Sequence, residues 1–212
     1  MSIRAGGISL RKLLVLLVLF ALAFAAVPAV QAFAEESEYY LEIDIANQCV
    51  TAYRTSDGSV VRQMICSTGL DTAPTPVGTY IMPEPEHSLE RVPWKPNGNV
   101  YINYATRIVR GIHFHSVLYN RPNYSSVNTT SVRKMGQKAS QGCIRLWDAD
   151  AEWIAKQCPP GTVVYIFDDG SRNDYMRSVL MNVGSYTADI GLTYDQYICY
   201  SSDPDTLSRS SS

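Results

Sequence analysis

The sequence has little charge and few histidines. Asp, Glu, Lys and Arg make up 18% of its 212 residues, against roughly 25% in an average globular domain. The formal net charge is −2, which excludes a nucleic-acid-binding protein that works through bulk positive charge. Hydrophobic residues reach only 46%, too few for a multispan membrane protein. The length allows one domain with short additions.

The cysteines also lack a familiar arrangement. None of the five forms a C-x-x-C pair, so zinc-ribbon and thioredoxin-like sites find no support. Only three histidines are present, and each can be considered by itself.

One long apolar run, residues 13–27, stands near the N-terminus. Three basic residues and no acid precede it, and the Ala32-Phe33-Ala34 sequence follows it. This order is typical of a secretory signal peptide ending near residue 34. The run is short for a permanent span, but an uncleaved membrane anchor is the alternative. Either way we expect an exported protein of the cell envelope. Cleavage after residue 34 removes the three basic residues and brings the net charge to −5.

Beyond residue 34 the pattern predicts a mainly β domain over 35–169, of sandwich or barrel type. Strands are predicted at 39–45, 49–55, 60–66, 100–106, 108–117 and 162–167. One short helix is predicted at 148–157, where an acidic start precedes a Pro-Pro-Gly stop. Residues 170–212 form a polar extension with a second helix at 172–183 and a disordered end.

Two disulfides are expected in an oxidising compartment. Asp57-Gly58 predicts a two-residue hairpin, and its register places Cys49 opposite Cys66 in a non-hydrogen-bonded pair. The Cα separation of such a pair permits a bridge, the alternative being two buried free thiols. If Cys143 stays free, parity leaves Cys158 to pair with Cys199.

Cys143 lies in a polar, glycine-containing turn, unlike the cysteines in strand or helix patterns. A nucleophilic thiol needs exposure, a base and backbone N–H groups near the reacting carbonyl, and Gly142 permits a tight turn. His113 and His115 share one face of a predicted strand, whereas His87 lies in a Pro-rich loop. These two histidines and Cys143 would need a further ligand to hold zinc, so no metal is expected. A structural role for Cys143 is the alternative.

These residues resemble the L,D-transpeptidase catalytic domain, the YkuD-like family. The family's signature is a His followed by Gly or Ser, and then an S-x-G-C turn. The matching residues here are His115-Ser116 and the run S-Q-G-C-I-R-L at 140–146. An S-T-G run and a T-P-x-G-x-Y run occur upstream in the family's order, and the resemblance covers residues 39–168. It implies the family's β-sandwich or barrel-like fold.

The resemblance also implies a mechanism. Cys143 attacks the carbonyl that joins the third residue of a peptidoglycan tetrapeptide stem to D-Ala, D-Ala leaves, and a thioester remains. The side-chain amine of a second stem then forms a 3→3 cross-link. His115 is the general base and acid because Ser follows it, and the Ser116 carbonyl orients its ring. Backbone N–H groups around Gly142 and Cys143 form the oxyanion hole.

Three residues are assigned to substrate binding. Arg145 contacts a substrate carboxylate, or is an ordinary surface arginine. Gln141 stands where many relatives have a second histidine. If that position contributes mainly its backbone, activity survives; if the relatives' imidazole tunes the thiolate, Gln141 shifts the rate or the pH optimum. The separation of His115 from Cys143, 28 residues, is longer than in many relatives. Residues 118–139 are therefore expected to form a lid with Tyr119 over the cleft, together with Asn120 and Tyr124.

The expected partners are peptidoglycan stem peptides, with carbapenem-type β-lactams as covalent inhibitors and no cofactor. Two alternatives remain open from the sequence. In an L,D-carboxypeptidase, water replaces the acceptor amine. In a catalytically weak peptidoglycan-binding module, the cleft is kept and turnover is lost through Gln141.

Overall fold

The computed structural model describes residues 37–183 and 186–187. The expected signal or anchor, residues 1–34, and the final segment, 188–212, lie outside the described residues. Within these described ranges, no helix has the length and apolar character needed to cross a membrane.

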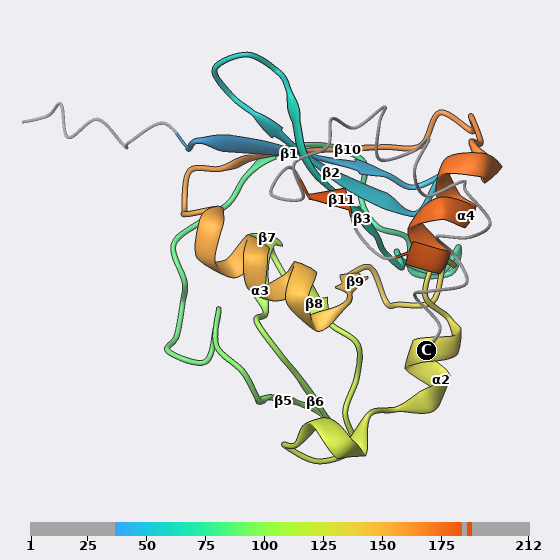
Figure 1. Cartoon of the computed structure of the whole chain (residues 1–212). Helices are drawn as coiled ribbons and strands as arrows, with labels where there is room; N and C mark the ends of the chain where they lie inside the picture. Colours follow the sequence, from blue (N-terminus) through green and yellow to red (C-terminus); the bar gives the residue numbers. More distant parts are fainter. Residues whose placement is uncertain (1–36, 184–185, 188–212) are drawn as a thin grey trace, which may run out of the picture. The chain divides into compact units, whose positions relative to one another are not determined.

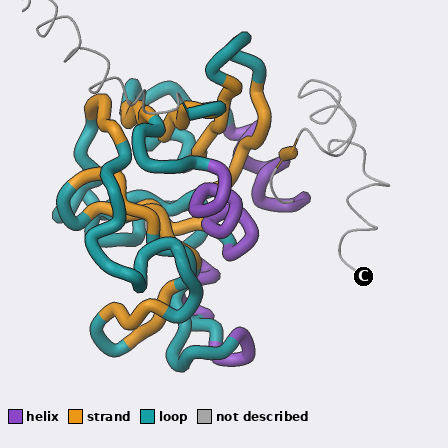
Figure 2. The backbone as a smooth tube through the Cα atoms, turned by 90° about the vertical axis from the view of Figure 1, so that its left-hand side faces the viewer, coloured by secondary structure: helices purple, strands orange, loops and turns teal. Residues whose placement is uncertain are grey.

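The fold is mainly β, as predicted, with short strands joined by longer connections (Figure 2). The strands are β1 Tyr39–Asp44, β2 Cys49–Arg54, β3 Val60–Ile65, β4 Gly78–Ile81, β5 Lys95–Asn97, β6 Val100–Ile102, β7 Thr106–Val109, β8 Ile112–Ser116, β9 Ile144–Leu146, β10 Val163–Phe167 and β11 Tyr186–Thr187. The described helices are the 3₁₀ turn η2 Tyr124–Ser126 and the α-helices α2 Thr129–Arg133, α3 Asp148–Gln157 and α4 Asp174–Val183.

A six-stranded sheet has the order β11-β3-β2-β1-β10-β4. Its centre, β1, pairs in parallel with β10 and antiparallel with β2. Along β1 the buried residues Leu41 and Ile43 alternate with half-buried Tyr40 and Glu42, the two-residue period that predicted this strand. A three-stranded sheet, β7-β8-β9, and the β5-β6 hairpin complete the described strands.

The main core lies between the large sheet and the three-stranded sheet. Helix α3 packs against the three-stranded sheet (Figure 1). Phe114 of β8 and Leu146 of β9 meet Leu41 and Val164 there, and Ile154 of α3 joins them. These side chains are at most 1% exposed, so the hydrophobic effect holds the two sheets together. The strands that carry the candidate active-site residues are therefore anchored by this core.

A second core contains Cys49 and Ile65, which belong to β2 and β3. Helix α4 covers it with Met176 and Leu180 and contacts β3. The predicted helix at 172–183 is thus present as α4 at 174–183, and it packs on the large sheet.

The predicted Cys49–Cys66 disulfide is wrong. The turn is longer than predicted, because Arg54 and not Ser56 faces Ser59, with the Arg54 N–H bonded to the Ser59 carbonyl. The bulge between Ala52 and Tyr53 recovers only one of these two positions, so Cys49 faces Ile65 instead of Cys66. One residue of slip sends a side chain to the opposite face of a sheet, and Cys66 accordingly lies in the main core while Cys49 lies in the second. Both are buried free thiols, and so is Cys158. The other expected partner, Cys199, lies outside the described residues.

Helix α3 has the predicted bounds, 148–157. The strand predicted at 108–117 is instead two strands, because Arg110 adopts a left-handed conformation (φ 49°) and the chain turns back at Gly111. This turn between β7 and β8 lies at the candidate active site.

Candidate active site

A cavity of about 510 Å³ contains the two residues that the sequence singled out. Cys143, just before β9, and His115, on β8, both line it. Strands β8 and β9 pair in parallel, with His115 opposite Arg145, so Cys143 lies two residues before the partner of His115 and both side chains line the cavity. Asn97 and Gly98 line the cavity from the β5-β6 hairpin.

His115 is 3% exposed and has a defined tautomer. Its Nδ1 lies 2.6 Å from the carbonyl oxygen of Ser116. Since a carbonyl only accepts, the ring proton of neutral His115 is on Nδ1, and Nε2 keeps its lone pair for a substrate proton. Burial lowers the pKa of His115 to about 4, although the Ser116 carbonyl opposes this shift. His115 is therefore neutral at pH 7 and able to accept a proton.

Ser116 is itself fixed by a second interaction. Its backbone N–H donates to the Asn103 carbonyl at 3.0 Å, and its hydroxyl accepts from the Asn103 N–H at 2.9 Å. Asn103 is fully buried, and its side chain donates to Asp148 at 2.7 Å. No sequence pattern points to Asn103, because its role depends on the hydrogen bonds between Asn103, just after β6, and Ser116 at the end of β8.

The Cys143 thiol is partly exposed and donates to the Gly111 carbonyl at 3.6 Å. Burial raises the pKa of Cys143, while the backbone N–H of His113 and the charges of Arg145 and Lys95 lower it. At rest the site therefore holds a neutral thiol and a neutral imidazole. Proton transfer from sulfur to His115 must accompany attack.

The Cys143 turn depends on Gly142. This residue has φ 107°, and an added Cβ would meet Ile112 Cδ1 at 2.7 Å. Its carbonyl accepts from the Thr75 hydroxyl at 2.8 Å, and this hydroxyl also accepts from the Gly69 N–H. The upstream S-T-G and T-P-x-G runs thus hold the cysteine turn.

The structure gives the Gly142 amide a different role from the one expected. Its N–H donates to the Ser140 hydroxyl at 3.1 Å, which in turn donates to the Cys143 carbonyl at 2.6 Å. The Gly142 N–H is therefore occupied within the turn. No hydrogen bond among the described residues uses the Cys143 N–H, which leaves that amide for an oxyanion.

Arg145 is a buried cavity residue, so the surface-arginine alternative is wrong. It is 7% exposed, its Nε has no hydrogen-bond partner, and no described carboxylate forms an ion pair with it. Burial lowers the pKa of its guanidinium. An unpaired buried cation is costly, and it favours an anionic ligand in the cavity. Gln141 lines the same cavity with an exposed side chain.

The position expected for Tyr119 is wrong. Its side chain is 4% exposed and its hydroxyl donates to Asp148 at 2.5 Å, because the backbone of Tyr119 pairs with Tyr101 of β6. Tyr119 contacts Trp94 edge-on inside the second core. Leu118 and Ala139, at the ends of the expected lid, line the cavity instead.

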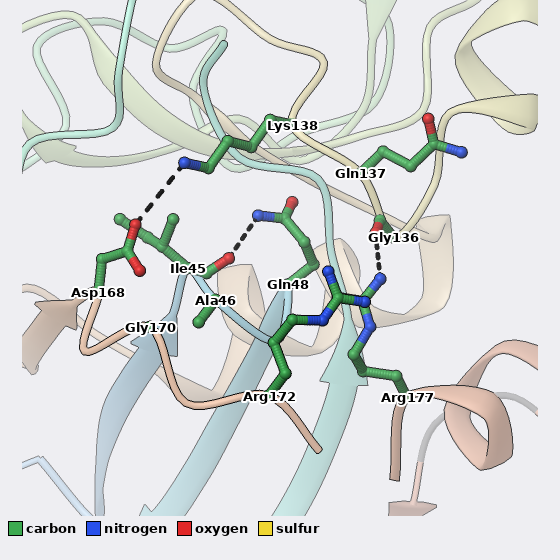
Figure 3. Close-up of a pocket in the computed structure, with 10 residues that line it drawn as sticks. All are labelled: Ile45, Ala46, Gln48, Gly136, Gln137, Lys138, Asp168, Gly170, Arg172 and Arg177. Atoms are coloured by element: carbon green, nitrogen blue, oxygen red, sulfur yellow. Dashed lines mark hydrogen bonds and ion pairs between the residues drawn. The ribbon is translucent and has the colours of Figure 1, made fainter. Parts of the chain in front are cut away.

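A second cavity of about 400 Å³ lies beside residues 136–138 (Figure 3). Its cations already have protein partners: Lys138 is 3.6 Å from Asp168, and Arg177 donates to the Gly136 carbonyl at 2.9 Å. It contains no cysteine or histidine. Across the described part of the chain, no group of three or more His, Cys, Asp or Glu residues could hold a metal ion.

A family model and a curated relative match this chain. Residues 38–166 match the YkuD family model, the L,D-transpeptidase catalytic domain. The protein YciB of Bacillus subtilis (strain 168), which is named as an L,D-transpeptidase, is 30% identical over 136 residues, covering 62% of this chain and 67% of YciB.

Solved structures give similar matches. An L,D-transpeptidase from Mycobacterium smegmatis is 25% identical with a TM-score of 0.48, over 62% of this chain and 59% of that one. L,D-transpeptidase 3 from Mycobacterium tuberculosis, in complex with a faropenem-derived adduct, is 24% identical with a TM-score of 0.46, over 61% and 60%. The chain thus spans less than two thirds of either solved chain. Because the family model matches more than half of its residues, this protein belongs to the YkuD family of L,D-transpeptidase catalytic domains.

Proposed function

We propose that the protein is an exported cysteine L,D-transpeptidase that forms 3→3 cross-links between peptidoglycan tetrapeptide stems. The observation that carries this proposal is the shared cavity of Cys143 and His115, in which the Ser116 carbonyl leaves His115 Nε2 free to accept a proton. Family membership supplies the substrate class.

In the first half-reaction, Cys143 sulfur attacks the carbonyl carbon between the third stem residue and D-Ala, and its proton passes to His115 Nε2. A carbon–sulfur bond forms and the carbonyl π bond opens to an oxyanion. When the oxyanion collapses, the carbon–nitrogen bond breaks and His115 returns the proton to the D-Ala amine. The products are D-Ala and a Cys143 thioester.

Two features of the cavity fit this substrate. The Cys143 N–H, unused among the described residues, is placed to stabilise the oxyanion beside the reacting sulfur. Arg145 offers a buried guanidinium that no carboxylate of the described residues pairs with, which suits the carboxylate of the leaving D-Ala or of the stem. The Cys143 N–H and the Arg145 guanidinium are thus hydrogen-bond donors, and the substrate would supply their acceptors.

In the second half-reaction, the side-chain amine of another stem attacks the thioester and gives its proton to His115. The new amide carbon–nitrogen bond replaces the carbon–sulfur bond, and the proton returns to the Cys143 sulfur. If water attacked instead, the same site would be an L,D-carboxypeptidase. Mass spectrometry of the products distinguishes the two, because only transpeptidation joins two stems.

The test compares Cys143→Ala and His115→Ala with the unchanged chain in release of D-Ala from a tetrapeptide stem. We expect either change to lower the rate by roughly a thousandfold or more, because nucleophile and base act as a unit. His87→Ala is the matched control, since this histidine is exposed, outside the cavity, and its loss should leave the rate unchanged. Persistent D-Ala release from Cys143→Ala would reject the proposal.

A β-lactam gives an independent readout of the same thiol. We expect a carbapenem to open its ring on Cys143 and increase the protein's mass by one inhibitor molecule, with the adduct located on the Cys143 peptide. Cys49, Cys66 and Cys158 are buried, so they should remain unmodified in the folded protein. An adduct on any of these cysteines in place of Cys143 would contradict the assigned nucleophile.

A further inference from the structure

His113 and the Cys143 thiol both contact the carbonyl oxygen of Gly111. The Gly111 oxygen accepts from the Cys143 thiol at 3.6 Å, and His113 Nδ1 lies 3.0 Å from the same oxygen. Because this oxygen can only accept, the ring proton of neutral His113 is on Nδ1. One carbonyl therefore joins His113 to Cys143.

The carbonyl belongs to the tight turn between β7 and β8. Arg110 in this turn is left-handed (φ 49°), a conformation that a residue with a side chain adopts only when its surroundings hold it. Gly111 itself lines the active-site cavity. The His113–Gly111 hydrogen bond closes the turn from the β8 side and fixes the direction in which the carbonyl points.

The other edge of the His113 ring lies near a buried ion pair. Nε2 is buried without a hydrogen-bond partner among the described residues, and it is 3.8 Å from Glu90 Oε1. Glu90 is 4% exposed and bonds to Arg107, which lies opposite His113 in the β7-β8 ladder. The ring therefore lies between the Gly111 carbonyl and the Glu90–Arg107 pair.

We propose that His113 is a positioning residue for Cys143: its Nδ1–H holds the Gly111 carbonyl that contacts the thiol, while its Nε2 faces the Glu90–Arg107 pair. The inference rests on the proposed function only in taking Cys143 as the nucleophile. The sequence alone places His113 on the same strand face as His115 and does not indicate this role.

The arrangement matters most once sulfur loses its proton. The Gly111 oxygen then faces a thiolate, and two negative centres repel each other. The Nδ1–H of His113 draws charge from that oxygen, and the His113 backbone N–H lowers the pKa of Cys143 directly. Lys95, Arg145 and His115 also face this region, and none of them contacts the Gly111 carbonyl. Losing the Nδ1–H should therefore raise the pKa of Cys143 further.

The test measures alkylation of Cys143 by iodoacetamide in the full-length chain from pH 7 to pH 10, with the labelled peptide identified by mass spectrometry. His113→Gln keeps polarity and a donor at the Nε2 position but loses the Nδ1 donor, and His113→Phe loses both. His113→Asn is the matched control, because its amide can reach the Nδ1 position. Circular dichroism checks that each variant folds.

We expect His113→Gln and His113→Phe to shift the pH profile upward by about one unit, which is roughly a tenfold lower rate near neutral pH, while His113→Asn stays within about twofold of the unchanged chain. If His113→Gln keeps the original profile, or if His113→Asn loses as much as His113→Gln, the positioning role is overturned. Alkylation needs no peptidoglycan. A chain that shows the expected profiles yet releases no D-Ala would therefore reject the proposed function and support this inference.

Discussion

Gly142 is a residue at which a single added carbon should slow the reaction. Its φ of 107° disfavours any side chain, and a Cβ would also press on Ile112 at 2.7 Å. We expect Gly142→Ala to cost about 3 kcal/mol of stability and to lower D-Ala release at least about tenfold, since the Cys143 turn must move. Denaturant unfolding and the D-Ala assay measure the two effects.

Gly58 is the control at the same scale. It also has a positive φ, 69°, but nothing lies within 4 Å of an added Cβ. Gly58→Ala should therefore cost only about 1 kcal/mol and leave the reaction rate unchanged. Equal losses of activity in the two variants would show that the effect of Gly142→Ala is not specific to the Cys143 turn.

Individual residues also show which site features a sequence can predict. Cys143 and His115 were predictable because the chemistry demands those residue types and a short motif surrounds them. Tyr119 was placed in the cleft because it begins a long polar segment, but its backbone pairs with β6 and carries the ring into the second core. His113 and Gly111 act through the turn between β7 and β8. The apolar pattern of 108–117 predicted one continuous strand there and no turn. Side-chain direction in such segments depends on tertiary contacts.

At the scale of elements, the first residue of α3 links the segments that follow β6 and β8. Asp148 accepts from the Asn103 side chain at 2.7 Å and from the Tyr119 hydroxyl at 2.5 Å, one on each carboxylate oxygen. Asp148→Ala removes both acceptors, and the buried Asn103 amide is left without its partner. We expect a loss of roughly 2–4 kcal/mol in the free energy of unfolding, with Asp148→Asn losing about half as much because one acceptor oxygen remains.

Urea or guanidinium unfolding of both variants measures this difference. The Tyr119 hydroxyl offers a second measurement, because burial and the hydrogen bond to Asp148 raise its pKa. Asp148→Ala should lower the pH at which this tyrosine ionises in an ultraviolet titration. Equal stability of Asp148→Ala and Asp148→Asn would show that the carboxylate does not link these elements.

Element boundaries were predictable where local signals suffice. Helix α3 begins at an acidic residue and ends before Pro159-Pro160, and its bounds follow from those residues alone. The register of the β2-β3 hairpin did not follow from Asp57-Gly58, because the chain turns over residues 55–58 and not over 57–58 alone. The bulge after Ala52 compensates for only one of the two extra residues. The lost disulfide has the same cause, since register decides which face each cysteine occupies.

At the scale of the whole molecule, the described domain is held by its two cores and not by cross-links. Cys49, Cys66 and Cys158 lie in those cores as free thiols, and Cys143 is free in the cavity. Removing a native disulfide typically costs 2–5 kcal/mol, which would lower the melting temperature by several degrees. Here dithiothreitol should leave the melting temperature unchanged, and all four thiols should react with an alkylating agent in denaturant without prior reduction. A lower melting temperature in reductant, together with protection of Cys49 and Cys66 from alkylation, would instead show that the hairpin adopts the bridged register, with Cys66 facing Cys49.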